Sequence, residues 1–405
     1  MKEVKPGSAA GDSARSPSSA RPPVIVTCVL AVVMAGTTAP SPLYALYSKQ
    51  MDFGLSTTTT IFAVYAAGVL CALITAGSWS DAVGRRPILI SACVLAIASD
   101  VTFLLAHNVS ALLIARVLSG VSAGLCSGAA TAAIIESTPH QWGSERAALL
   151  ASIANMGGLA IGPLLGGALA EYGPAPLHLV FAVHLVLTVL GAIGIALIPE
   201  TSPYTGTLDI QRLTVPVTVK PVFVVAAMAT FAGFSATALF TAAMPTFLAD
   251  LTSITNAALG GLLVTTALAT SSVAQLAAGR IRTRRALIIG CLLLATSMVS
   301  LIAAMVLSSL LLLVAAAFLA GAGQGVNFNR GLTAVLTLAP QQVRAEITSV
   351  YFIVVYTAMS VPIVGVGIAS QRWDMTTAVT GFAIGVMCLS AICAQQASRT
   401  NALVH

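Results

Sequence analysis

Long apolar stretches alternate with short polar ones along almost the whole chain. A helix needs about 20 mostly apolar residues to cross a lipid bilayer, and twelve stretches are long enough. They lie at about 24–47, 57–79, 88–106, 110–135, 146–170, 177–198, 221–248, 256–279, 286–307, 310–338, 346–369 and 375–397. The pattern predicts an all-α membrane protein with twelve transmembrane helices.

Polar segments divide this series of helices. The longest internal one, 199–219, is expected to be a cytoplasmic linker between an N-terminal six-helix bundle, 23–198, and a C-terminal six-helix bundle, 220–397. Residues 1–22 are rich in Ser, Ala, Pro and basic side chains and are expected to form a disordered cytoplasmic tail. Residues 398–405 are expected to form a second, short cytoplasmic tail.

Composition and charge exclude an ordinary soluble protein. Of the 405 residues, 57% are hydrophobic and 8% are charged, whereas about 25% of a soluble chain is charged. Fifteen Lys and Arg residues fall on the side of both termini, and only Lys49 and Arg372 fall in the opposite loops. The positive-inside rule therefore predicts cytoplasmic termini in a cell (inner or plasma) membrane. The same distribution explains the net charge of +6 without a nucleic-acid partner.

The sequence shows no pattern typical of an enzyme or a metal site. All seven cysteines lie in apolar runs, with no Cys-x-x-Cys pair and no histidine cluster, as expected for small buried side chains. Phosphate-binding loops and metalloprotease or hydrolase signatures do not occur. We therefore expect neither catalysis, nor a metal, nor a cofactor.

The two halves contain matching positions. Gly120 and Gly124 of the fourth span match Gly321 and Gly325 of the tenth, and an Arg pair follows both the second and the eighth span. Such internal duplication is typical of transporters, whose binding site lies between the repeats near the bilayer midplane. The alternative is chance similarity between apolar helices, which the coincident Arg pairs disfavour. We expect two pseudo-symmetric bundles.

The loop after the second span carries a compact group of glycines and charges. Its marked positions are Gly77, Asp81, Gly84, Arg85 and Arg86. Glycine permits close helix contact at the first position and a tight turn at the third. Asp81 can pair with Arg85 or face the positive end of a helix. The alternative is that the arginines only anchor the topology.

The fifth span has a face without side chains. Gly158, Gly162 and Gly166 recur every four residues, Pro163 bends the same helix, and Gly167 follows. A bare face lets a neighbouring backbone pack very close inside the membrane. We expect this face to lie against the other bundle. A generic packing face is the alternative.

Both motifs resemble signatures of the major facilitator superfamily. The loop is similar to the pattern G-x-L-a-D-r-x-G-r-k-x-x-l, with Trp79 in place of Leu and Ala82 in place of the first basic residue. The fifth span resembles the antiporter motif of twelve-helix, proton-coupled drug exporters. The resemblance implies the major facilitator fold and alternating access. It also implies that the loop, together with Glu136, latches the two halves in the outward-open state.

An arginine in the fourth span needs a partner. Arg116 resembles the family pattern l-x-x-x-R-x-x-q-G, with Ser119 in place of Gln. A charge in the bilayer costs about 2.5–3.5 kcal/mol on insertion scales. Asp100 and Arg116 lie at similar depth on either side of a turn near Asn108. We expect them to form an ion pair whose protonation couples to transport, or else a static structural pair. His184 can titrate near neutral pH or can be a structural hydrogen-bonded residue.

The tenth span provides candidates for substrate contact. Arg330 has no acidic residue at its own depth in the second half, and Gln324 and Asn327 lie in the same helix. Arg330 can hold an anionic or carbonyl-bearing substrate, contact the opposite half in one state, or extend toward the cytoplasm. Tyr44 and Phe234 are candidates for an apolar cavity wall, with packing against lipid or protein as the alternative.

These motifs favour a secondary active transporter that exports a small organic compound, drug-like or metabolic, in exchange for protons. The first span contains no Asp or Glu, a position that several related exporters use for coupling, so the proton carrier stays open. The alternatives are an uptake permease or facilitator for a sugar or organic acid, and a non-transporting membrane sensor. The expected partners are the substrate, protons and the lipid bilayer, and the expected state is a monomer.

Overall fold

The computed structural model describes residues 21–76, 79–139, 143–202, 204, 213–252 and 256–400, and the described chain is helical throughout. The helices of the first half are α1 (Arg21–Thr38), α2 (Tyr44–Met51), α3 (Leu55–Ala76), α4 (Trp79–Ala82), α5 (Arg85–Leu104), α6 (Val109–Ser137), α7 (Ser144–Tyr172) and α8 (Leu179–Leu197). Those of the second half are α9 (Lys220–Thr252), α10 (Ala257–Ala278), α11 (Thr283–Leu307), α12 (Leu310–Leu338), α13 (Arg344–Arg372) and α14 (Met375–Arg399). Twelve helical segments of the described chain are long and apolar enough to cross a membrane, which confirms the predicted fold class.

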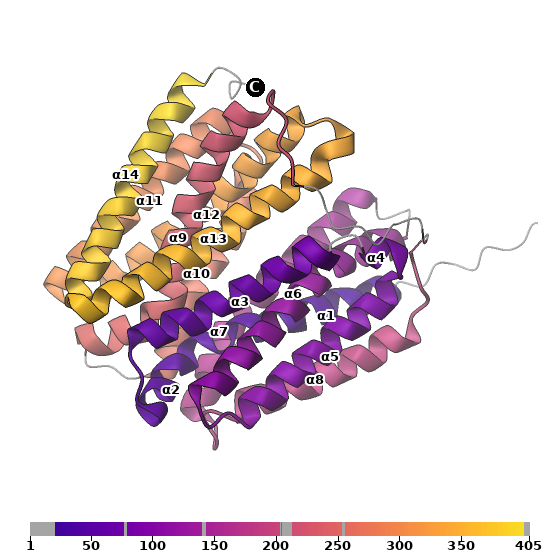
Figure 1. The fold of residues 1–405 in the computed structure, drawn as a ribbon, viewed down its shortest axis with the longest axis horizontal. Helices are drawn as coiled ribbons and strands as arrows, with labels where there is room; N and C mark the ends of the chain where they lie inside the picture. The colour runs from indigo at the N-terminus through magenta and orange to yellow at the C-terminus, as the bar shows by residue number, and fades with distance from the viewer. Residues whose placement is uncertain are drawn as a thin grey trace, which may run out of the picture.

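The helices form two bundles that lie side by side (Figure 1), α1–α8 in one and α9–α14 in the other. Across the boundary, α7 packs on α10 and α3 packs on α13. We call the side of the membrane that holds the ends of α7 and α13 the far side, because it is opposite to the chain termini. The contacts described below place the closest approach of the two bundles on the far side.

Polar residues on the far side begin four of the long helices. Asn108 caps α6 through Ala111 N, at 2.9 Å, and Asn256 caps α10 through Leu259 N, at 2.8 Å. Ser309 and Asp374 act in the same way at α12 and α14. Each side-chain oxygen accepts a bond from a backbone N–H that the first helical turn leaves free. These residues therefore set where the chain re-enters the membrane.

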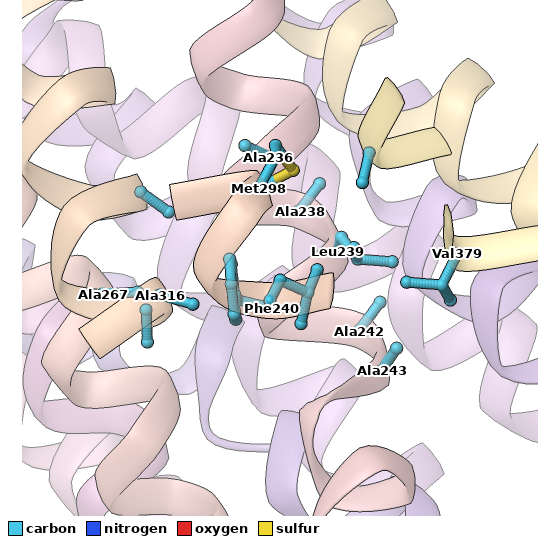
Figure 2. Close-up of a cluster of buried hydrophobic side chains, with 14 of the residues drawn as sticks. Ala236, Ala238, Leu239, Phe240, Ala242, Ala243, Ala267, Met298, Ala316 and Val379 are labelled. Atoms are coloured by element: carbon cyan, nitrogen blue, oxygen red, sulfur yellow. The ribbon is translucent and has the colours of Figure 1, made fainter. Parts of the chain in front are cut away.

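Small side chains dominate the core. Figure 2 shows the largest cluster of the second bundle, where Ala236, Leu239 and Phe240 of α9 meet Met298 of α11 and Val379 of α14. Alanines between the larger side chains let the helix backbones approach closely, which is the usual packing of membrane helices. The first bundle contains a comparable cluster built around α1, α5, α6 and α7.

Candidate functional site

The structure gathers the charged residues of the α3–α5 loop around one arginine. The buried Arg85 forms ion pairs with Asp81 and with Glu136, the latter at 2.9 Å, and donates to Ser80 Oγ at 2.6 Å. Gly77 lies outside the described residues. The hydrogen bonds and ion pairs of these side chains lie within the first half and the start of the linker. Among the described residues, the cluster makes no hydrogen bond or ion pair with the second bundle in this conformation.

A residue that sequence reasoning missed completes this cluster. The carboxylate of Glu200 accepts hydrogen bonds from the backbone N–H groups of Arg85 and Arg86, at 2.8 and 3.0 Å, and of Thr201 and Ser202, both at 2.9 Å. Burial opposes the charged form of Glu200, but the four N–H donors outweigh it, so the pKa of this carboxyl lies below its usual value. The linker is thus bonded to the start of α5.

A local signal for Glu200 exists in the sequence. Pro199 ends the sixth span and an acid follows it directly, while α5 begins with free N–H groups after Gly84. Gly84 has a φ of 119°, and a Cβ at this position would lie 2.7 Å from Glu200 Oε2. The glycine is therefore required both by the backbone conformation and by the carboxylate that lies against it.

The bare face of the fifth span lies against α1, in its own bundle. A Cβ at Gly158 or Gly162 would collide with a carbonyl group of α1, and a Cβ at Gly166 would collide with that of Ala39, directly after α1. The expectation that these glycines face the second bundle is wrong. A four-residue glycine period identifies a close-packed face but carries no information about which helix covers it.

Pro163 strengthens the same contact between α7 and α1. Proline has no N–H, so the carbonyl of Leu159, four residues earlier, loses its helical donor. Thr38 of α1 supplies the missing bond, from its Oγ1 to Leu159 O at 2.8 Å. The proline and the glycines therefore act together to fix α1 on α7.

A neighbouring face of α7 meets the second bundle. Gly167 packs against the backbone of Ala257 in α10, and Gly261 of α10 packs against the Pro163 carbonyl. Two hydrogen bonds cross the same boundary. Thr265 Oγ1 donates to Ala160 O at 2.9 Å, and the backbone N–H of Ala257 donates to Glu171 Oε2 at 2.8 Å.

Helices α3 and α13 also pack closely on the far side. Gly367, near the end of α13, packs against Ser56 and Thr59, near the start of α3. The far side is therefore where the two bundles are held together.

The predicted ion pair between Asp100 and Arg116 does not form. Asp100 Oδ2 instead lies 2.7 Å from Nδ1 of His184 in α8. The helices do meet at the predicted depth, since Ser99 Oγ donates to Ala115 O at 2.8 Å. The next residue along each helix is rotated by about 100°, which turns Asp100 toward α8 and Arg116 toward α1. Depth was therefore predicted correctly and direction was not.

Arg116 binds α1 and an aromatic ring. Its Nη1 donates to the carbonyl of Thr37 at 2.6 Å, and its guanidinium lies 4.4 Å from the centroid of the Tyr65 ring. The side chain is 1% exposed, and its Nε has no hydrogen-bond partner among the described residues. A permanently charged group is thus held in the first bundle by a carbonyl and a π face rather than by a carboxylate.

The polar candidates of α12 point to different neighbours. Arg330 Nη2 donates to Thr283 Oγ1 at 2.8 Å, at the start of α11. Gln324 accepts a hydrogen bond from Ser271 of α10. Asn327 donates to the carbonyl of Ala229 in α9 at 3.4 Å. All three side chains therefore make contacts inside the second bundle and do not converge on one point.

The aromatic candidates separate in the same way. Tyr44 is 1% exposed, inside the core of the first bundle. Phe234 makes an edge-to-face contact with Phe328 of α12, with ring centroids 5.4 Å apart. Phe328 in turn lies 6.2 Å from Phe352 of α13, and Phe352 lies 6.4 Å from Tyr356. We call this series, Phe234, Phe328, Phe352 and Tyr356, the aromatic row.

The aromatic row reaches the first bundle. Tyr356 packs against the core cluster that contains Tyr65, and Tyr65 carries the Arg116 guanidinium on its ring. Helices α9, α12 and α13 of one bundle and α3 and α6 of the other therefore bring aromatic faces and one cation to the same boundary. The half-buried rings of the aromatic row are of a type that can stack on a flat or apolar organic compound.

A separate apolar groove lies on the outside of the second bundle. It has a volume of about 550 Å³ and lies between α9, α13 and α14, with Phe231, Trp373 and Phe382 among its walls. All its lining residues belong to the second half, so it is not shared between the bundles as the aromatic row is.

Comparison with protein families settles the class of the chain. The family model of the Major Facilitator Superfamily matches residues 26–364. The chain belongs to the Major Facilitator Superfamily. Its fold and family are those of transporters, and small-molecule transport across a lipid bilayer is the activity of the class.

Curated relatives of this facilitator cover only part of it. The quinolone resistance protein NorA of Staphylococcus aureus is 27% identical over 130 residues, 32% of this chain and 33% of its own length. The multidrug transporter MdfA of Escherichia coli O6:H1 is 29% identical over 159 residues, 39% of this chain and 38% of its own length. The chain thus matches between a third and two fifths of the length of these relatives.

Solved structures share the whole fold. A bacterial homolog of the human lysosomal transporter Spinster, in an inward-facing and occupied conformation, has a TM-score of 0.71 at 15% identity, over 95% of this chain and 98% of its own. A POT family transporter in complex with 5-aminolevulinic acid has a TM-score of 0.74 at 13% identity, over 91% and 94%. At these identities the similarity shows the facilitator fold alone.

Proposed function

We propose that this facilitator is a secondary active exporter of small organic compounds, drug-like or metabolic, driven by exchange for protons. One observation carries the proposal. Helix α7 packs by its backbone on α1 with one face and on α10 of the other bundle with the next. In a backbone-to-backbone contact no side chain can change its rotamer to keep the helices together as they move apart. The contacts on the far side are therefore expected to form together or to break together.

Two further observations support export. NorA and MdfA carry names of drug-resistance transporters, although they match less than two fifths of the chain. The aromatic row offers stacking surfaces rather than the hydroxyl and amide groups that a sugar requires. In this proposal both termini are cytoplasmic, the far side faces outward, and a single chain transports.

Uptake or facilitated diffusion is the second candidate. Helix α1 contains neither Asp nor Glu, so the first span carries no acid to exchange a proton. A facilitator that equilibrates a sugar or an organic acid needs no such group. The direction and the energy dependence of transport therefore decide between the two functions.

The test uses inverted membrane vesicles and ethidium as the transported probe. A proton gradient, acidic inside, is expected to drive ethidium into vesicles that contain the protein, and nigericin, which collapses the gradient, is expected to release it. Ethidium transport that persists without a gradient would favour the facilitator, and gradient-driven loss of probe from the vesicles would favour uptake.

The glycine contact supplies a matched pair of variants. Gly158→Ala is expected to abolish gradient-driven accumulation, because the new Cβ meets the α1 backbone, and to destabilise the fold by about 1–3 kcal/mol. Gly157→Ala, one residue earlier in the same helix, places its Cβ in open space and is expected to retain transport. Equal transport by the two variants would mean that the close contact between α7 and α1 is not needed for export, which contradicts the proposal.

A further inference from the structure

We infer that Asp100 and His184 form the proton-binding site of this transporter, and that helix α1 couples this site to the substrate surface. The inference rests on the proposed proton exchange and names the group that carries the proton. The pair lies inside the first bundle, with 6% of the Asp100 side chain and 11% of the His184 side chain exposed. Its position in two spans separates it from the charged cluster of the α3–α5 loop.

The hydrogen-bond geometry indicates how many protons the pair holds. Nδ1 of His184 lies 2.7 and 2.9 Å from the two carboxylate oxygens of Asp100, and Nε2 lies 3.0 Å from the carbonyl of Val32 in α1. A carbonyl can only accept, so Nε2 carries a hydrogen. A second hydrogen must lie between Nδ1 and the carboxylate. The pair therefore holds one proton more than a neutral histidine beside a carboxylate.

Loss of that shared proton changes the contact. The Nδ1 lone pair and a carboxylate oxygen would then face each other at hydrogen-bond distance, and the pair would become a buried anion. Among the described helices packed around the pair, α1, α5, α6 and α8, Arg116 is the other charged side chain at this depth. Its bonds go to Thr37 and Tyr65 instead. Release of the proton therefore requires His184 or α1 to move.

Helix α1 is placed to transmit this movement. The His184 ring packs directly on Gly36, where a Cβ would overlap it, and binds the carbonyl of Val32. Five residues after Val32, the carbonyl of Thr37 binds Arg116, whose guanidinium lies on the Tyr65 ring. The neighbouring face of α1, at Ala31 and Ala35, packs on the glycine face of α7. One helix therefore links the proton site, the Arg116–Tyr65 contact and helix α7, whose next face closes the far side against α10.

The order of events follows from the conformation. The pair holds its extra proton while the far side is closed. In an exporter with the far side outward, this is the state that has brought a proton from outside and is about to release it to the cytoplasm. Proton release then loosens α1 before the next substrate is bound.

The test measures movement of the far side without any substrate. Spin labels on ketone-bearing unnatural amino acids replace Tyr172, at the end of α7, and Leu311, at the start of α12, both 78% exposed. In the full-length protein in liposomes, the distance distribution between them is expected to shift between about pH 5 and pH 8, the range in which histidine titrates.

Matched variants distinguish a pair that gains and loses a proton from a pair that only holds the helices together. His184→Gln keeps a donor for the Val32 carbonyl but cannot titrate, and Asp100→Asn removes the carboxylate. Both are expected to lose the pH-dependent shift. His107→Gln, at an exposed histidine in the α5–α6 turn, is expected to keep it. A wild-type protein without a shift, or a shift that survives in both pair variants, would overturn the inference.

Reconstituted transport distinguishes this inference from the proposed function. With a gradient of one pH unit, wild-type protein is expected to accumulate ethidium up to about tenfold for each proton exchanged. The pair variants are expected to equilibrate ethidium without accumulating it. Full accumulation by the variants would refute the proton site and leave export standing. Absence of accumulation by wild type, with the pH-dependent shift intact, would refute export and leave the site standing.

Discussion

The two bundles share corresponding contacts between their helices and differ in the side chains that lie inside them. In the first bundle, Ser99 of α5 donates a hydrogen bond to the carbonyl of Ala115 in α6, at 2.8 Å. In the second bundle, Ser297 of α11 donates to the carbonyl of Ala316 in α12, at 2.7 Å. The same bond thus joins the corresponding helix pairs, and it aligns the two halves residue by residue.

A second pair of contacts fixes the alignment of the outer helices. Arg86, at the start of α5, binds the carbonyl of Ala196 in α8, and Arg284, at the start of α11, binds the carbonyl of Ser398 in α14. Arg86 precedes Ser99 by the same number of residues as Arg284 precedes Ser297. The two sets of contacts therefore give one consistent alignment.

This alignment shows where the halves diverge. Three ionisable residues inside the first bundle have apolar counterparts in the second: Asp100 corresponds to Met298, Arg116 to Ala317 and His184 to Val386. Figure 2 shows Met298 inside the apolar core of the second bundle. Because the fold packs well without charges at these positions, the fold itself does not require them. Their cost in the membrane is expected to be offset by function.

The largest predicted effect comes from making the first bundle resemble the second. His184→Val alone leaves a buried carboxylate without its partner and is expected to lower the free energy of unfolding by about 3–5 kcal/mol. The double variant Asp100→Met with His184→Val is expected to recover most of this loss, because an apolar pair fills the space without a charge. Unfolding by a denaturing detergent, followed by circular dichroism, measures both.

The outcome of this double-variant cycle bears directly on the comparison. A double variant as unstable as the single one would mean that the first bundle needs its charges in order to fold, and that the two halves are not equivalent frames. A stable double variant that equilibrates ethidium without accumulating it would mean that the two charged residues are needed for proton coupling and not for folding.

The two arginines inside membrane spans, Arg116 and Arg330, give a smaller, contrasting effect. Arg330→Ala breaks one bond to Thr283, at the edge of the second bundle, and is expected to cost about 1.5 kcal/mol while leaving ethidium export intact. Arg116→Ala removes the link between α1 and Tyr65 and is expected to abolish export. Initial rates of ethidium accumulation at equal protein content provide the measurement, and Thr283→Val is the control for the lost bond. Loss of export in Arg330→Ala but not in Thr283→Val would indicate that Arg330 contacts the substrate or takes part in gating.

The sequence was sufficient for the features that depend on period and composition. Span length, the number of helices and the close-packed face of α7 follow from runs of apolar residues and from glycines four residues apart. The contact of Asp81 and Glu136 with Arg85 agrees with the family pattern. Each of these depends on local spacing, which a helix converts directly into a shared face.

The sequence was insufficient wherever one of several neighbours had to be chosen. Depth alone paired Asp100 with Arg116, but helix rotation decides the partner, and His184 lies on a helix far along the chain. The glycine face was assigned to the wrong neighbour for the same reason. The substrate candidates on α12 share a helix but not a face, so they point to α9, α10 and α11 separately. The prediction of the site was limited by the direction in which each side chain points in the folded bundle, not by the assignment of the helices.

The smallest predicted effect concerns the carboxylate that binds the start of α5. Glu200 accepts hydrogen bonds from the first N–H groups of α5, whereas no side chain among the described residues does so at the start of α11, after Arg282. Glu200→Ala is expected to lower the free energy of unfolding at neutral pH by about 1 kcal/mol, the usual cost of losing a helix cap. The expected transport rate is close to that of wild type, because the hydrogen bonds of Glu200 go to the start of α5 and to the linker and not to the aromatic row.

The pH dependence of this effect has a definite sign. The pKa of Glu200 is lower in the folded protein than its usual value, so its stabilisation is complete above the usual pKa of a glutamate and is lost as the pH falls through the folded pKa. Wild-type and Glu200→Ala unfolding curves are therefore expected to differ at neutral pH and to converge in acid, below about pH 4. A difference that stays constant across this range would assign the effect to packing. A difference that grows in acid would contradict the lowered pKa, and with it the contribution of the N–H donors of Arg85 and Arg86 at the start of α5.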